Sequence, residues 1–443
     1  MYGLSNTLEL GKRALMSQQL AMSTTGHNIA NVNTPGYSRQ RVEITSSYPV
    51  SLPQGIMGTG VMVGNITHIR DIFLTAQYRR ENGHLQRWTM THKSLSRIES
   101  FLNEPGETGL NQLLNDFFNA WENLTAYPDA RTAVIEKAKV LVNALHEQAA
   151  QLADMKRSIN QEISNCTEQI NVLASQIAAT NRQIISSELG GQKANDLRDR
   201  RDYLIDELST LTEVRTIHKE NGSVTALLGS MSLVDGADYL RIVTETESSG
   251  SDIVSVAYWE NTRFSIEFTG GQLLVLQEFR DRLIPEYQQG LDNLAETLIT
   301  QVNTIHAAGI GADGSTGVNF FDPLQTKAMT ITINVEIDSN VNLIAASLSG
   351  EPGDIRNAQA IGDLRHSRVM MSDSMTMNEF YADMVASLGI KVQESSNLKV
   401  NYELLVTQVE NARESIQGVS IDEEMANLVK YQRAYEAAAR IIT

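Results

Sequence analysis

The residues that could carry chemistry in this 443-residue chain do not have the spacing of a catalytic or metal site. The eight histidines show no metal-ligand spacing such as H-x-x-x-H, and no G-x-S-x-G nucleophile motif occurs. Glu423 and Glu424 are adjacent carboxylates, but neighbouring residues of a helix point in different directions, so they do not form a catalytic pair. We expect them to be acidic residues in the first turn of a helix, where they stabilise the helix dipole. The sequence therefore predicts no enzyme and no metal site.

One segment matches a nucleotide-binding pattern by its letters. Residues 309–314 read Gly-Ile-Gly-Ala-Asp-Gly, which fits G-x-G-x-x-G. A dinucleotide site needs a strand before this loop and a helix after it, whereas here a helical pattern precedes and a loop rich in Gly and Asn follows. We expect an ordinary turn and no cofactor.

Composition restricts the class of protein further. Cys166 is the single cysteine, so the chain cannot form an internal disulfide, and its place in a heptad stripe predicts a small buried side chain. The net charge of −17 argues against a nucleic acid or an anionic membrane as partner. The sequence shows neither the pattern of a cleaved secretory signal nor 18 consecutive apolar residues, so we expect no membrane span and a route of export that needs no cleaved signal.

The elements that must position any functional surface are helices at the two ends of the chain. One heptad frame runs through the first segment, with polar breaks at Gln18 and Thr25, and steps of four and three run through the last. Their apolar positions are Leu4, Leu8, Leu15, Met22 and Ile29 in the first segment and Ile421, Met425, Leu428, Tyr435 and Ile442 in the last. A stripe of this period must be buried against another helix, so we predict that the two ends pair as a coiled coil.

Tyr431, Tyr435 and Met425 could belong to the core of one subunit or to contacts between subunits, and we expect both, because a pair of helices leaves much of each surface uncovered. The charges agree. Residues 1–44 carry a net charge of +2 and residues 418–443 one of −1, which leaves −18 on the rest of the chain. This distribution is typical of a subunit that packs through its ends and keeps its body solvated.

The remaining pattern predicts a mainly α fold with inserted β structure. We expect extended or loop structure over 31–64. Helices are expected over 71–103, 110–126, 128–190, 197–211, 273–306 (interrupted near Pro285 and Gly290), 355–371 and 378–417. Strands are expected over 216–224, 232–235, 239–244, 253–259 and 264–269, with a short β piece at 329–337. Ser420 and Glu423 form a capping box at the start of the last helix.

These elements suggest five parts in chain order. The N-terminal half of an inner helical domain, with its connecting loop, covers 1–60, and the C-terminal half of the same domain covers 418–443. A long-helix domain covers 61–213, and its return helices, with the short β piece, cover 273–417. An inserted β domain covers 214–272. A helix as long as the one expected over 128–190 favours a shaft over a pocket-forming domain. We expect an intramolecular helical bundle and not a dimeric coiled coil, because the later helices of the same chain offer partners.

A motif follows the first helix and ends it. In Asn28-Ile29-Ala30-Asn31-Val32-Asn33-Thr34-Pro35-Gly36-Tyr37, Asn and Thr compete for backbone hydrogen bonds, Pro35 blocks helix continuation and Gly36 permits a tight turn. This stretch resembles the signature of the bacterial flagellar rod, hook and hook-associated proteins. Further matches, in family order, are Gly58 to Val61 with Asp71, Phe73, Leu74 and Gln77, then Val302-Asn303 with His306, Gly309, Gly317 and Phe320-Phe321, and finally Gly418 to Glu424 with Tyr431 to Tyr435.

The resemblance implies a non-enzymatic structural subunit of the flagellum, most similar to the hook-associated members that join hook and filament. Its motif residues would be Asn28, Asn31, Asn33, Thr34, Pro35, Gly36 and Tyr37. The implied partners are other copies in a ring, the hook protein, a second hook-associated junction protein and an export chaperone, and the implied location is the extracellular flagellum, reached through the flagellar type III apparatus.

Two departures and one alternative accompany this reading. The chain stops at Ile441-Ile442-Thr443 where family members typically continue with apolar heptads, so we expect an incomplete terminal pair, and the segment between Phe321 and Asp354 is short. The alternative is a helical-rod interaction module that binds one partner through its β domain.

Overall fold

The computed structural model describes residues 2–52, 55–102, 109–124, 128–249, 252–351 and 353–442. The chain forms two compact units. Unit 1 comprises Met1–Arg87, Ser164–Leu274 and Val400–Thr443, and unit 2 comprises Trp88–Ile163 and Val275–Lys399. The boundaries between the units fall within helices, so several helices contribute residues to both.

Helices dominate the fold. They are α1 (Tyr2–Ala30), α2 (Ile72–Leu102), α3 (Leu110–Glu122), α4 (Pro128–Ser187), α5 (Asn195–Leu211), α6 (Gly271–Glu278), α7 (Ile284–Ala308), α8 (Val335–Ser339), α9 (Arg356–Gly362), α10 (Met377–Gln417) and α11 (Ile421–Ile442). Short 3₁₀ turns cover Glu188–Gly190, Val341–Leu343 and Asp363–His366, and a π-helical segment covers Phe279–Leu283.

The strands form small antiparallel sheets. They are β1 (Gln40–Ser46), β2 (Val50–Leu52), β3 (Gly55–Met57), β4 (Val61–His68), β5 (Arg215–His218), β6 (Val224–Leu228), β7 (Met231–Asp235), β8 (Asp238–Tyr239), β9 (Ile242–Ser249) and β10 (Asp252–Trp259). The sheet orders are β1-β4, β2-β3, β5-β6-β7-β8 and β10-β9. The predicted fold class, mainly helical with inserted β structure, is confirmed.

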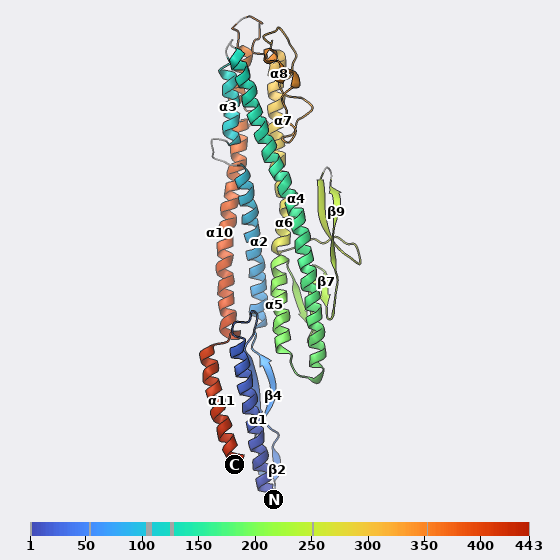
Figure 1. The fold of residues 1–443 in the computed structure, drawn as a ribbon, viewed down its shortest axis with the longest axis vertical. Helices are drawn as coiled ribbons and strands as arrows, with labels where there is room; N and C mark the ends of the chain where they lie inside the picture. The colour runs from blue at the N-terminus through green and yellow to red at the C-terminus, as the bar shows by residue number, and fades with distance from the viewer. Residues whose placement is uncertain are drawn as a thin grey trace. The chain divides into compact units, whose positions relative to one another are not determined.

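In unit 1 the two terminal helices pack against each other. Figure 1 shows α1 and α11 side by side and antiparallel, with the labels N and C at the same end. Strands β1 and β4 pair from Gln40↔His68 to Ser46↔Val61, and this hairpin also lies on α1. The extended or loop structure predicted over 31–64 agrees with these strands. Their pairing was not predicted, because the partner of β1 lies about twenty residues further along the chain.

The second part of unit 1 joins the end of α4 to α5 and the strands. Asn181 on α4 donates from Nδ2 to the carbonyls of Val224 and Gly236 at 2.9 and 2.8 Å, and its Oδ1 accepts from the Val224 N–H. Asn171, three turns earlier, binds both backbone groups of Ile242 in the same way. Buried amides thus satisfy strand backbone groups that would otherwise lack partners.

In unit 2 an aromatic cluster forms the core around α3, α7 and the loop after α7. Phe117 and Trp121 of α3 contact Phe320 with ring centroids 6.1 and 5.2 Å apart, and Phe320 and Phe321 pack edge to face. These side chains are completely buried. The apolar side predicted for this helix, including Phe118 and Leu124, is confirmed, although its end is at Glu122.

Several predicted boundaries were wrong. The segment near 329–337 is not a strand, because the Asn334 side chain accepts from Glu336 N–H and starts the short helix α8. Helix does not continue to residue 371, because α9 ends at Gly362 and is followed by the 3₁₀ turn Asp363–His366. The backbone at Met371, Ser372 and Asp373 is left-handed. Residues 264–269 form no strand beyond one bridge from Ser265 to Tyr258. Most of β6 lies between the strands predicted over 216–224 and 232–235. The predicted interruption before α7 is the π-helical segment that precedes Pro285.

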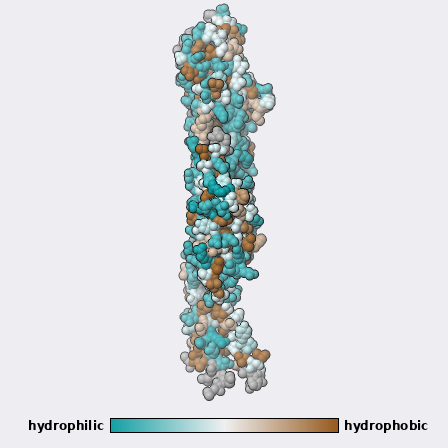
Figure 2. Space-filling view, turned by 90° about the vertical axis from the view of Figure 1, so that its right-hand side faces the viewer, coloured by the Kyte–Doolittle hydropathy of each residue, from teal (hydrophilic) through white to brown (hydrophobic). Residues whose placement is uncertain are grey.

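The surface is mixed in character. On the face shown in Figure 2, hydrophobic residues form scattered patches among hydrophilic ones. Within the described residues no helix is long and apolar enough to cross a membrane.

Candidate assembly site

Small side chains allow α1 and α11 to approach closely. A Cβ atom added at Gly11 would lie 2.7 Å from Cγ1 of Ile442, so glycine at this position makes room for the last turn of α11. Ala21 on α1 and Ala438 on α11 are almost completely buried. These small residues were not predicted to lie between the helices. Small residues among larger apolar residues of a helix indicate that another helix packs closely there.

The predicted stripe residues are only partly covered in a single copy. Seven of them are half-buried, namely Leu15, Met22, Ile29, Leu428, Tyr431, Tyr435 and Ile442. Leu8, Ile421 and Met425 are exposed, by 42%, 50% and 49%. The side chain of Leu4 lies outside the described residues. Within the described part of α11 only Glu424 and Ala438 are buried.

Asn28 is the centre of a buried hydrogen-bond network at the end of α1. Its Nδ2 donates to the Gln40 carbonyl at 2.9 Å and to Glu424 Oε2 at 3.0 Å. Its Oδ1 accepts from Tyr37 Oη at 2.8 Å and from Gln40 N–H at 2.9 Å. One amide therefore joins α1, the turn after it, β1 and α11.

The tyrosine of this network stays protonated. Burial, together with the carboxylates of Asp196, Asp199 and Glu424, raises the pKa of Tyr37 far above its ordinary value. Its hydroxyl can therefore act as a permanent donor to Asn28.

Arg39 attaches β1 to the start of α11. Its Nε donates to Glu424 Oε1 and its Nη1 to Glu423 Oε2, both at 2.7 Å. Its backbone N–H donates to the Gln417 carbonyl at the end of α10. The predicted capping contact is present as a long bond of 3.5 Å from Glu423 N–H to Ser420 Oγ, while the Glu423 carboxylate turns to Arg39.

The rest of the motif forms the turn itself. Asn31 donates to the His27 carbonyl at 3.0 Å, and Thr34 Oγ1 donates to Asn31 Oδ1 at 3.1 Å. Gly36 has a φ of +75°, and a Cβ there would lie 2.8 Å from Cβ of Tyr203 on α5. Asn33 and Pro35 are exposed.

Four carboxylates on α5 bind this region, and the sequence analysis missed them. Asp196 accepts from Gln40 Nε2 at 2.6 Å, and Asp199 accepts from Ser38 N–H at 2.9 Å. Asp206 pairs with Arg79 of α2 at 2.6 Å and with Arg413 of α10 at 2.9 Å. The signal was their spacing of three, three and four residues with Asp202, which places them on one face of a helix.

Asp202 is buried, as are Asp199 and Asp206. Burial alone would raise its pKa, but Arg70, which lies 2.5 Å away, together with Arg201 and Arg79, outweighs that effect and lowers the pKa. The carboxylate is therefore ionised at neutral pH. Such a pair fixes geometry more than it adds stability.

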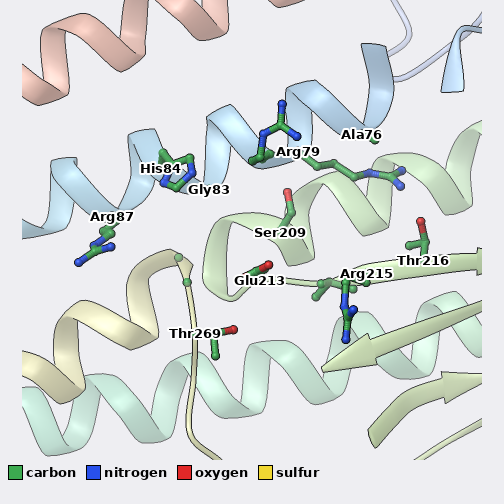
Figure 3. Close-up of a pocket in the computed structure, with 14 residues that line it drawn as sticks. Ala76, Arg79, Gly83, His84, Arg87, Ser209, Glu213, Arg215, Thr216 and Thr269 are labelled. Carbon is green, nitrogen blue, oxygen red and sulfur yellow. The ribbon is translucent and has the colours of Figure 1, made fainter. Parts of the chain in front are cut away.

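A cavity of about 490 Å³ lies beside these pairs, between α2, α5 and the start of α6. Figure 3 shows Arg79 and His84 on α2, Ser209 on α5 and Thr269 before α6 around it. Arg79 is already paired with Asp206. Among the described residues no group of three or more His, Cys, Asp and Glu could hold a metal ion.

Comparisons with known proteins point to one family. The model of the flagellar hook-associated protein FlgK helical domain matches residues 95–321. The models of the flagella basal body rod protein and of the flagellar basal body rod FlgEFG protein C-terminal region match residues 8–37 and 414–443, which carry the helix pair described above.

Whole relatives are similar over nearly their full length. Flagellar hook-associated protein 1 of Bacillus subtilis is 31% identical, over 98% of this chain and 95% of the relative. The protein of the same name from Escherichia coli is 25% identical, over 99% and 97%. The structure of the flagellar hook junction protein FlgK from Burkholderia pseudomallei matches with a TM-score of 0.69 and 16% identity, over 77% of this chain and 100% of that one, which supports the fold alone.

Proposed function

The chain belongs to the flagellar hook-associated protein 1 family, the non-enzymatic structural subunits of the hook–filament junction in the extracellular flagellum, and we propose that it polymerises there through its paired terminal helices. Copies would form a ring in which each α1–α11 pair is completed by its neighbours. The relevant residues are the stripe Leu4, Leu8, Leu15, Met22, Ile29, Ile421, Met425, Leu428, Tyr431, Tyr435 and Ile442.

The incomplete burial of the pair is the observation that supports this proposal. Leu8, Ile421 and Met425 remain exposed by 40 to 50% after α1 and α11 have packed together. Apolar stripes of this kind are stable when another helix covers them, and short helices without such cover are marginal in water. A neighbouring copy in a ring would supply that cover.

We infer that the motif residues Asn28, Asn31, Asn33, Thr34, Pro35, Gly36 and Tyr37 set the direction of the terminal pair. Asn28 connects four segments through one buried amide, and Gly36 lets the turn pack on α5. Residues 1–60 and 418–443 would then act as the inner helical domain, with 61–213, 214–272 and 273–417 as the long-helix domain, the inserted β domain and the return helices.

The partners follow from the place of the family in the flagellum. We propose that the hook protein and a second hook-associated junction protein flank the ring, and that an export chaperone holds the terminal segments before assembly. Export would proceed through the flagellar type III apparatus without a cleaved signal. The near-neutral ends and the strongly acidic remainder of the chain support contacts through the ends.

Limited proteolysis tests the assembly proposal. In the isolated monomer, residues 1–30 and 420–443 should be cut well before the centre of α4, because they lack their neighbours. In purified flagella the same segments should resist. A monomer whose ends resist as firmly as its centre would contradict the proposal, as would a chain lacking residues 1–30 that still assembles at the junction.

A further inference from the structure

A second polar pocket lies within unit 1, between the motif loop and the end of α10. Its volume is about 300 Å³. One wall is the loop Val32–Tyr37, and the other contains Glu410, Arg413, Glu414 and Gln417. The exposed residues of the motif, Asn33, Thr34 and Pro35, therefore line this pocket.

The pocket is acidic. Its one cationic wall residue, Arg413, is already paired with Asp206 at 2.9 Å and stacked 4.6 Å from the centroid of the Tyr78 ring. Glu410 and Glu414 are exposed, and neither forms an ion pair within the described residues. Two uncompensated carboxylates therefore determine the local potential, which favours a cation.

A buried acceptor at the same place lacks a donor. Gln417 is 6% exposed, and its Oε1 receives no hydrogen bond from any described residue. Buried polar atoms without a partner are rare in folded proteins, and each one calls for an explanation. A ligand with N–H groups that enters the pocket would supply both the missing donor and the missing positive charge.

The chain carries unpaired cations on the outer face of α11. Lys430, Arg433 and Arg440 are exposed and make no ion pair within the described residues. The buried positions Glu424 and Ala438 define the face that packs on α1, and helical geometry at 100° per residue places Arg433 on the opposite face. These groups point away from their own partner helix.

The cations of α11 cannot reach the pocket of their own chain. Val419 lines the pocket, and Arg433 follows it by fourteen residues, nearly all of them helical, which separates them by roughly 20 Å along the axis at 1.5 Å per residue. That separation is far beyond the length of an arginine side chain. Any such contact must therefore come from another molecule.

We propose that the pocket between Val32–Tyr37 and the end of α10 binds the guanidinium group of Arg433 from the α11 helix of a second copy. This inference rests on the proposed function and names one of its contacts. It joins two different surfaces, so it is a head-to-tail contact of the kind that generates rings or helical arrays. The carboxylates of Glu410 and Glu414 would pair with the guanidinium, and Gln417 Oε1 would accept one of its N–H groups.

Charge reversal with a matched control tests the contact. Cells that carry each full-length variant as their only copy would be used to purify flagella, and the amount of the chain retained would be measured. Glu414→Lys and Arg433→Glu should each lower retention by up to about fivefold, the upper limit of the factor expected from the loss of a single exposed ion pair. The double variant should recover most of it. Glu403→Lys makes the same charge change on α10 outside the pocket and should behave like the wild type.

Thiol cross-linking provides a readout that does not depend on stability. A direct disulfide needs Cβ atoms about 4 Å apart, which is shorter than the span of an Arg–Glu ion pair, so a bismaleimide that bridges the longer span is used. In a chain with Cys166→Ala, the double variant Glu414→Cys and Arg433→Cys should form linked dimers and larger linked species in flagella treated with this reagent, and either single variant should not. Absence of dimers in flagella that contain the chain would overturn the inference, as would a charge-reversed double variant no better than its singles. Absence of the wild-type chain from flagella would instead overturn the proposed function.

Discussion

At the scale of single residues, His306 shows how one buried side chain fixes a loop. Its Nε2 accepts from Ala345 N–H at 3.0 Å, so the proton lies on Nδ1, which is 2.7 Å from the Val318 carbonyl. Burial lowers the pKa of His306 to about 4. The neutral ring thereby connects α7 to two separate loops of unit 2.

This shift predicts a pH dependence. Below the ordinary histidine pKa of about 6.5 the unfolded chain takes up a proton that the folded chain refuses, so stability should fall by about 3 kcal/mol between pH 6.5 and pH 4. Hydrogen-exchange protection of the Ala345 amide would measure it. His306→Gln should remove most of this dependence, whereas His366→Gln, at an exposed position of unit 2, should preserve it. Equal slopes in both variants would contradict the assignment.

At the scale of elements, the turn after α1 determines how the terminal helix meets the rest of unit 1. Gly36 combines a left-handed backbone with close packing, since a Cβ would lie 2.8 Å from Cβ of Tyr203. Gly191 shares the left-handed backbone, with a φ of +82°, but has nothing within 4 Å of its Cβ position. Substitution at Gly191 therefore tests backbone strain alone, whereas substitution at Gly36 tests backbone strain together with steric crowding.

Gly36→Ala should therefore destabilise unit 1 more than Gly191→Ala. Both variants incur about 1 kcal/mol for the left-handed backbone, and Gly36→Ala should lose a further 1–3 kcal/mol, approximately, through overpacking against α5. Urea unfolding followed by exchange of the Ser38 amide, which binds Asp199, would measure the difference. Indistinguishable losses would show that the turn does not depend on its contact with Tyr203.

The sequence predicted elements with a long, local period well. The helix expected over 128–190 is α4, Pro128–Ser187, and the one expected over 71–103 is α2, Ile72–Leu102. The sequence Glu104-Pro105-Gly106, whose proline and glycine indicate the end of that helix, lies outside the described residues. The pairing of β1 with β4 was not predicted, although Val42 and Ile44 of β1 alternate with the polar residues Arg41, Glu43 and Thr45. Their pairing depends on residues distant in the chain.

The same limit applies to the assembly site. The motif analysis identified Asn28 and Gly36 as the end of a helix and a turn, which is a local inference. It could not identify Glu424, because that partner lies 396 residues away. The acids of α5 had a readable spacing, but only the folded chain brings them to Ser38, Gln40 and Arg79.

At the scale of the whole molecule, net charge is unevenly distributed along the chain. The ends are near neutral, while the other residues hold a net charge of −18. Apolar side chains are exposed in both parts, Leu8, Ile421 and Met425 at the ends and Leu189 and Ile217 elsewhere. Like charges repel, so contacts between copies are favoured at the near-neutral ends.

Polar substitution of exposed apolar residues on α11 should therefore affect assembly without affecting the monomer. Ile421→Gln combined with Met425→Gln should change the thermal stability of the isolated chain by about 1 kcal/mol or less, since both side chains are already half exposed. Retention in purified flagella should fall strongly. Leu189→Gln with Ile217→Gln removes comparable exposed apolar surface elsewhere and should leave retention unchanged. Loss with both pairs would indicate a general solubility effect.

The antiparallel packing of the first helix on the last has a consequence for biosynthesis. A polypeptide interrupted after residue 399 contains every residue of unit 2, yet lacks all of α11 and the carboxylate that binds Asn28. Its α1 has no helix to meet, however well the interior folds. Only a chain translated through its last helix can therefore form the α1–α11 pair, so a chain that lacks α11 is not expected to assemble with other copies.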